Sequence, residues 1–113
     1  MTPVIPGREY GGIREEMRDT QEIERYRFSS RFLFIPGKGL SWRYIAYEDI
    51  RGVISGVTRE SEDRFLVSYS VKLPNLRVMY RDGFELLQFE REKNARIAAD
   101  LIRSGMNSRA EEV

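Results

Sequence analysis

Residues 77–90, which read RVMYRDGFELLQFE, constrain the fold of this chain more than any other stretch. The pair Asp82-Gly83 separates two runs rich in apolar residues, which is a strong short-range signal for a β-hairpin. A two-residue type I′ turn at this pair predicts that Arg81 faces Phe84. The further pairs of this register are Met79–Leu86, Val78–Leu87 and Leu76–Phe89. A consistent apolar face results, which we expect to be the core side, and it comprises Leu76, Val78, Leu87 and Phe89.

The opposite face of this hairpin is mixed and partly apolar. It carries Arg77, Met79, Arg81, Phe84, Leu86 and Gln88. Exposed apolar groups beside arginines are typical of protein interfaces. We therefore take five of these residues as a candidate surface for a protein partner or a homo-oligomer: Arg77, Met79, Arg81, Phe84 and Leu86. The alternative is that residues 1–20 fold back and cover this face.

A helical pattern follows the hairpin directly, from about residue 91 to residue 104. Its apolar positions recur at the spacing of one helix face and comprise Ala95, Ile97, Ala98, Leu101 and Ile102. Gly105 is the expected residue just beyond the helix end. A helix of this length is marginal alone in water, so its apolar stripe needs a sheet or the open end of a barrel to cover.

The region before the helix predicts consecutive β-strands. We expect strands at residues 22–30, 32–36, 40–46, 51–57 and 64–71, then the two strands of the hairpin. Residues 58–63 predict a polar loop and residues 72–75 a break. Within 64–71, the alternation places Phe65, Val67, Tyr69 and Val71 on one face. Because the connections are short, the expected fold is mainly β, a seven-stranded antiparallel barrel or sandwich capped by one C-terminal helix.

The chain divides into three expected parts around a single domain. Residues 1–20 are an N-terminal extension whose Pro and Gly indicate loops, with a short helix that places Ile13 and Met17 on one face. Residues 21–105 form the domain, and residues 106–113 a polar tail. A chain of 113 residues is long enough for one real core.

The composition excludes many kinds of chemistry, because the chain has no Cys and no His. It therefore offers no thiolate nucleophile, no imidazole base and no Cys or His metal ligand. No calcium-loop, phosphate-loop or dinucleotide-binding motif is present. We expect a protein that is not an enzyme and has no cofactor.

Composition also bounds the environment of the chain. Hydrophobic residues make up 41% and charged residues 33%, which is typical of a globular protein rather than a disordered or membrane-embedded one. The N-terminal stretch MTPVIPGREYGG lacks the continuous apolar run of a signal peptide. We expect a soluble, cytoplasmic protein. The net charge of +1 makes nucleic acid an improbable partner.

Three pieces of the chain resemble the pleckstrin-homology (PH) superfold, especially its GRAM and bacterial PH-like branches. RYRFSSRFLFIP is similar to the opening strand, polar turn and apolar strand of those domains, and RYIAYEDIRGV to their apolar strand, acidic pair and following strand. LRVMYRDGFELLQFEREKNARIAADLI is similar to their last hairpin and terminal helix. The resemblance covers about residues 22–104 and implies a PH-like barrel capped by the helix.

The resemblance also raises the alternative of a peripheral membrane module, since many PH domains bind anionic lipid headgroups. The basic residues that this implies are Arg25, Arg27, Arg31, Lys38 and Arg43. Within residues 22–49 they are offset by Glu22, Glu24, Glu48 and Asp49, which leaves a net charge of +1. One net charge adds only about 1 kcal/mol of attraction to an anionic surface. We therefore rank a non-enzymatic interaction module first and a lipid-binding module second.

Two other features have a structural and a functional interpretation. Trp42, the only tryptophan, is expected in the core or wall of the domain, with an interface anchor as the alternative. Arg25-Tyr26-Arg27-Phe28 alternates basic and aromatic residues, a pattern that also occurs in sheets that bind single-stranded nucleic acid. In a strand this alternation separates the two kinds onto opposite faces, so an ordinary half-buried strand is favoured.

Overall fold

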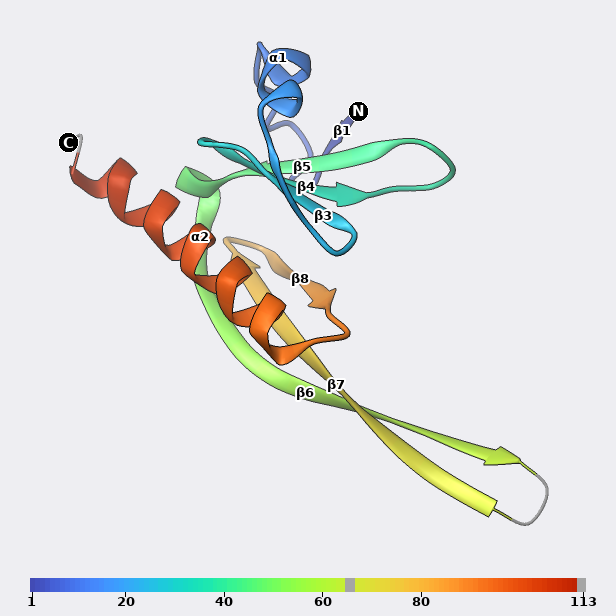
Figure 1. The fold of residues 1–113 in the computed structure, drawn as a ribbon. Coiled ribbons are helices and arrows are strands. Elements are labelled where there is room, and N and C mark those ends of the chain that lie inside the picture. The colour runs from blue at the N-terminus through green and yellow to red at the C-terminus, as the bar shows by residue number, and fades with distance from the viewer. Residues whose placement is uncertain (65–66, 112–113) are drawn as a thin grey trace.

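The computed structural model describes residues 1–64 and 67–111, with side chains for residues 1–57 and 73–108. The elements are β1 Thr2–Pro3, α1 Ile13–Arg18, β2 Gln21–Ile23, β3 Tyr26–Phe28, β4 Phe32–Pro36, β5 Trp42–Ala46, the 3₁₀ turn η1 Tyr47–Asp49, β6 Ile50–Arg64, β7 Val67–Tyr80, β8 Gly83–Gln88 and α2 Glu92–Glu111. The strands form a five-stranded sheet A in the order β1-β5-β4-β3-β2 and a three-stranded sheet B in the order β6-β7-β8 (Figure 1). The prediction of a mainly β fold with a C-terminal helix is confirmed. The two sheets do not close into a barrel, so the predicted seven-stranded barrel is not confirmed.

Both faces of sheet A are covered, which explains why residues 32–36 are apolar at every position before the proline. Leu33 and Ile35 point into the main core, whereas Phe32 and Phe34 point to the other side. On that other side they pack with Ile13 of α1. The N-terminal segment is therefore part of the packed structure: β1 pairs in parallel with β5, and Val4 is buried in the main core.

The inner face of sheet B and the apolar stripe of α2 make the rest of the main core. The four side chains predicted for the core face of the hairpin are all buried: Leu76, Val78, Leu87 and Phe89. They pack with a helix stripe that comprises Ala95, Ala98, Ala99 and Ile102. Figure 1 shows α2 lying in front of sheet B, with sheet A above it. The predicted core face of the hairpin is confirmed. The predicted helix stripe is confirmed in part, because Ala99 is buried in addition to the prediction, whereas Ile97 and Leu101 are only partly buried.

The hairpin register differs from the prediction by two residues. Its central turn residues are Arg81 and Asp82, and Tyr80 pairs with Gly83, so that Leu76 faces Leu87 instead of Phe89. None of the turn residues has a positive φ, so the turn is not type I′. Gly83 instead lies beneath the ring of Tyr80, where a Cβ atom would be 3.2 Å from the Tyr80 hydroxyl oxygen. Because the error is an even number of residues, every side chain keeps its predicted face.

The predicted strand boundaries were wrong in two further places. Residues 22–30 form not one strand but the hairpin of β2 and β3, whose turn contains Glu24 at a φ of 54°. The expected loop at 58–63 and the expected break at 72–75 lie inside β6 and β7, which pair continuously and project from the domain as a long ribbon (Figure 1). The shared face expected for Phe65, Val67, Tyr69 and Val71 lies outside the described side chains.

Pro74 lies within β7 but does not interrupt its pairing, because of the direction in which its backbone faces. The N–H of Phe89 donates to the Pro74 carbonyl oxygen over 2.9 Å, so the backbone of Pro74 faces the side of β8. A residue of an antiparallel strand presents its nitrogen and its carbonyl to the same side. Since β8 ends at Gln88, the missing N–H of Pro74 falls just past that strand and removes no ladder bond.

Two side chains fix the position of α2 at its ends. At the start, the carboxylate of Glu24 accepts hydrogen bonds from the N–H of Glu90 over 2.7 Å and from the side-chain amide of Asn94 over 2.9 Å. An acidic group near a helix N-terminus is favourable for the free N–H groups and for the helix dipole. The β2–β3 turn of sheet A is thereby tied to the beginning of the helix.

Near the other end, Gly105 lies against the ring of Tyr47. The predicted helix end at Ser104 was wrong, because α2 continues to Glu111 and contains Gly105. A Cβ atom on Gly105 would lie 2.2 Å from Cδ2 of Tyr47, a distance that atoms cannot share. The ring itself is buried, and its hydroxyl donates to the Ser29 carbonyl oxygen over 2.8 Å. Gly105 is thus required for close packing rather than for ending the helix.

The substitution Gly105→Ala should destabilise the protein, although alanine is the better helix former. The clash with Tyr47 should cost about 1–3 kcal/mol, which exceeds the gain of about 1 kcal/mol in helix propensity. The exposed control Asn107→Ala should instead raise stability by about 0.5 kcal/mol. Urea unfolding of the three proteins measures both effects. A Gly105→Ala protein as stable as the control would contradict the packing described here.

Tyr47 also predicts a fall in stability at alkaline pH. Burial, with the charge of Glu16 adding to it, raises the pKa of the Tyr47 hydroxyl above its ordinary value. Above about pH 10 the unfolded chain loses this proton while the folded chain keeps it, so stability decreases as pH rises. Tyr47→Phe should lower stability by about 1 kcal/mol at pH 8 but show a shallower decrease between pH 8 and pH 11. Equal slopes in the two proteins would show that Tyr47 does not titrate in this way.

Candidate functional site

The face of sheet B turned away from the core presents a group of exposed apolar side chains. Register places Ile54, Arg77 and Leu86 side by side across the three strands. In the neighbouring row Met79 pairs with Phe84 on one side and with Gly52 on the other. We call these five side chains the outer face: Ile54, Arg77, Met79, Phe84 and Leu86.

The exposure of the outer face is high for side chains of this kind. Ile54 and Phe84 are each 53% exposed and Leu86 is 42% exposed. The guanidinium of Arg77 lies over the ring of Phe84, 4.9 Å from its centroid, as a cation–π contact. Gly52 has no side chain to cover Met79 from β6. The outer face is therefore an apolar surface with one cation held against it.

Four of the five residues predicted as a partner surface lie together on the outer face, and the fifth, Arg81, is in the exposed turn at its end. The structure adds Ile54, which sequence reasoning missed. The alternation of residues 53–57 predicts only that Ile54 lies on the face of its strand opposite to that of Val53 and Val57. The pairing of that strand with the hairpin could not be deduced, because the ladder shifts between Ile50 and Gly52.

Residues 1–20 do not cover the outer face. Their apolar side chains pack on sheet A, where Ile13 is buried with Phe32 and Phe34 and is flanked by Tyr10 and Met17. The strand within this segment, β1, pairs with β5. The alternative considered from the sequence, in which this segment folds back over the hairpin, is therefore wrong for the described residues.

The five basic residues of the predicted anionic surface lie at separate places. Arg27 and Arg43 pair with the consecutive residues Phe34 and Ile35, so they point to opposite faces of sheet A. Arg31 is in the turn before β4 and Lys38 in the turn after it. Arg25 is in the β2–β3 turn, with its guanidinium 5.9 Å from the centroid of the Tyr26 ring. The structure thus does not bring these five cations together.

Arg43 is engaged in the contact between the two sheets. Its guanidinium binds the carboxylate of Glu85 on β8 through both nitrogens, with Nη1 at 3.2 Å from Oε2. The Glu85 side chain is only 19% exposed. A two-pronged, partly buried pair of this kind is stronger and more directional than a surface ion pair. Arg43 is therefore a structural residue and is not free to bind an anion.

The other candidates from the sequence have structural roles. Trp42 is half-buried beside the sheet A core and lies under the guanidinium of Arg27, in agreement with its expected place in the wall. Asp49 accepts hydrogen bonds from Arg8 and Tyr10 over 2.8 and 2.7 Å. Burial raises the pKa of Tyr10, and the hydrogen bond to Asp49 adds to this effect. The described residues contain no cluster of acidic side chains that could hold a metal ion.

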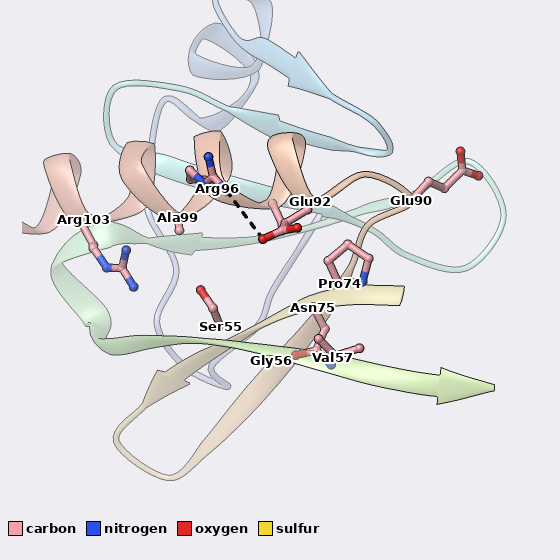
Figure 2. A pocket seen from close by; sticks show the side chains of 11 residues that line it. Ser55, Gly56, Val57, Pro74, Asn75, Glu90, Glu92, Arg96, Ala99 and Arg103 are labelled. Atoms are coloured by element: carbon pink, nitrogen blue, oxygen red, sulfur yellow. Dashed lines mark ion pairs between the residues drawn. The ribbon is translucent and has the colours of Figure 1, made fainter. Parts of the chain in front are cut away.

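A groove of about 530 Å³ lies between α2 and β6 (Figure 2). Ser55 and Val57 line it from the strand, and Ala95 and Ala99 from the helix. Two arginines of α2, Arg96 and Arg103, also line it. Sequence reasoning missed this groove, because it depends on how far the small residues of the helix hold α2 from the strand.

No family model matches this chain, and no curated protein or solved structure is significantly similar to it. Neither helix in the described part of the chain is both long enough and apolar enough to pass through a lipid bilayer. Function is therefore inferred from the surfaces of the fold itself.

The role assigned to Arg43 predicts that its substitution lowers the stability of the protein more than substitution of Lys38. Arg43→Ala leaves the carboxylate of Glu85 partly buried without its partner, which should cost about 1–2 kcal/mol. Lys38→Ala, an exposed residue in the turn between β4 and β5, should change stability by no more than about 0.5 kcal/mol. Urea unfolding at neutral pH measures both. Equal effects of the two substitutions would place Arg43 outside the sheet-to-sheet contact.

Proposed function

We propose that this chain is a non-enzymatic interaction module that binds another protein, or a second copy of itself, through the outer face of sheet B. The observation that carries the proposal is the exposure of Ile54, Phe84 and Leu86 on one surface of a packed sheet. Isolated exposed apolar residues need no explanation, but a group of them on one face marks an interaction site.

The energetics of the outer face suit protein binding. Burying one large apolar side chain contributes about 1.5–3 kcal/mol, so three exposed ones supply a useful share of a binding free energy. Arg77 adds a residue type that is enriched at interfaces, and its stacking on Phe84 limits its rotamer freedom before binding. The inner face of the same strands is core, which keeps the surface rigid.

The assignment to the PH-like superfold, in its GRAM or bacterial PH-like branch, is part of this proposal. It is supported by the order of the elements. Strands β2 to β5 form consecutive antiparallel neighbours, strands β6 to β8 form a second antiparallel set, and the long helix comes last. The absence of Cys and His from the sequence supports a role without catalysis. A cytoplasmic location also belongs to the proposal.

A protein partner is favoured over an anionic membrane by the same geometry. Membrane binding by a peripheral domain needs several cations on one surface, each contributing about 1 kcal/mol. The five predicted cations occupy both faces of sheet A and both ends of β4, and Arg43 is bound to Glu85. The outer face of sheet B, by contrast, gathers its apolar groups on neighbouring strands.

A charge introduced on the outer face should weaken the proposed binding. In Leu86→Asp and Phe84→Asp the new carboxylate would have to be desolvated in the interface, so affinity should fall at least about tenfold, or 1.4 kcal/mol. The matched control is Leu40→Asp, a fully exposed leucine in the β4–β5 turn of sheet A. Sedimentation velocity measures self-association, and affinity capture from cell extract compares the proteins bound by each variant.

The outcomes of this experiment separate the alternatives. The proposal predicts that the outer-face variants lose the oligomer or the captured protein that the wild type and Leu40→Asp retain. If all variants keep the same oligomeric state and the same bound proteins, the outer face is not the interface. Salt-sensitive binding of all variants to vesicles containing phosphatidylserine, without a protein partner, would favour the membrane alternative.

A further inference from the structure

The backbone of β6 has a free side, and that side faces the groove against α2. In sheet B, β6 is an edge strand, since it pairs with β7 alone. The carbonyl oxygen of Val53 accepts a hydrogen bond from Arg103 of α2 over 3.2 Å. That oxygen therefore points away from β7 and toward the helix.

The pairing pattern of β7 shows independently which backbone groups of β6 point away from β7. The backbone of Pro74 faces β8, as its bond from Phe89 shows. Backbone direction alternates along a strand, so Asn75 and Arg77 face β6, where they pair with Gly56 and Ile54. The intervening residues Ser55 and Val57 must then present their N–H and carbonyl groups outward, as Val53 does. Among the described residues, the backbone hydrogen bonds made outside the helices and strands include none from the N–H groups of Ser55 or Val57.

The groove beside this free edge has room for another chain. On the helix side the groove is lined by Ala95 and Ala99, whose small side chains are buried. On the strand side it is lined by Ser55, Gly56 and Val57. Val57 is 60% exposed, so the groove offers apolar contact as well as backbone groups. Figure 2 shows Ser55 pointing from β6 toward α2, with Arg103 toward one end of the groove and Pro74 toward the other.

Two basic and two acidic residues line the groove, and they are unevenly placed along it. Arg96 and Arg103 line the groove two helical turns apart, which is about 10 Å. Arg96 is 3.6 Å from Glu92, but both side chains are more than two-thirds exposed, so that pair is weak and easily exchanged. The acidic residues Glu90 and Glu92 lie at the end of the groove near the start of the helix. The middle and the Val53 end of the groove therefore favour an acidic occupant.

We infer that this groove binds an extended segment of a partner protein, which adds to sheet B as a strand beside β6 and carries an acidic residue toward Arg96 and Arg103. Alternating free N–H and carbonyl groups are the complement of another peptide backbone, and each backbone hydrogen bond contributes about 1 kcal/mol. Long unpaired strand edges with apolar side chains are the places where chains add to sheets. This groove and the outer face lie on different sides of the sheet and are separate sites.

The probe for this inference is a phage-displayed library of random linear twelve-residue peptides, selected on the wild-type protein. Peptides that bind the groove should contain an acidic residue within a run of β-forming residues. Hydrogen exchange by NMR then reads the site directly. On peptide binding, the amides of Ser55 and Val57 should become at least about tenfold more protected, because they gain hydrogen bonds. The amides of Ile54 and Gly56, already bonded to β7, should not change.

Variants of the protein test the two parts of the inference. Ser55→Pro removes an outward N–H without removing a ladder bond, and should weaken peptide binding at least about tenfold. Arg96→Glu should weaken it by a similar factor, whereas Lys93→Glu, an exposed charge on the same helix outside the groove, should not. Leu86→Asp on the outer face should leave peptide binding unchanged, so failure here is distinct from failure of the outer-face interface.

Three results would overturn the inference. One is a selection that yields no peptide whose binding protects Ser55 and Val57. Another is protection that spreads equally over Ile54 and Gly56, which would indicate general stabilisation and not strand addition. The third is protection of Ser55 and Val57 that depends on protein concentration without peptide, which would assign the edge to a second copy of this chain.

Discussion

The packing of α2 across the inner face of sheet B is the interaction on which the rest of the structure depends. A three-stranded sheet has two faces, and this helix buries only one of them. The helix is held by Glu24 at its start and by the close approach of Gly105 to Tyr47 near its other end. These two contacts also tie the helix to sheet A and to η1. Once α2 covers the inner face, the outer face is left to solvent or to a partner.

The same packing creates the groove. Because Ala95 and Ala99 are small, α2 can lie over the sheet without its side chains reaching the edge of β6 beyond Val53. Arg103 contacts the edge of β6 at the carbonyl oxygen of Val53. One helix therefore produces both candidate surfaces: an apolar face on the far side of the sheet, and an open strand edge along its own flank. The two surfaces have different chemistry, since one offers side chains and the other offers backbone groups.

Much of the sheet B arrangement could be predicted from the sequence because its signal has a period of two. The turn was placed one residue too late, which shifts the register by two residues. Leu76, Val78, Leu87 and Phe89 were still assigned to the core, and Phe84 and Leu86 to the outer face. What the sequence could not supply were contacts between distant segments. In the sequence Gly105 indicates the end of a helix, whereas in the structure it allows the close approach of the Tyr47 ring. In the sequence Arg43 is a candidate for binding an anion, whereas in the structure it binds the carboxylate of Glu85.

The strand edges show a similar limit. Polar residues 58–63 are typical of a loop, but paired across a ribbon they satisfy their backbone groups as a strand. The free edge at Ser55 and Val57 follows only from the direction in which Val53 and Pro74 point, which no residue type reveals. Backbone direction is set by register, and register here depends on an irregularity between Ile50 and Gly52.

The central claim is that α2 seals one face of sheet B and leaves the other open. Paramagnetic broadening of methyl NMR signals by a soluble gadolinium chelate tests it most directly. Methyl groups of Ile54 and Leu86 should be strongly broadened, because their side chains are about half exposed, whereas those of Leu76 and Leu87 should be unaffected. Equal protection of all four residues in the isolated monomer would contradict the account, since it would mean that part of the chain already covers the outer face.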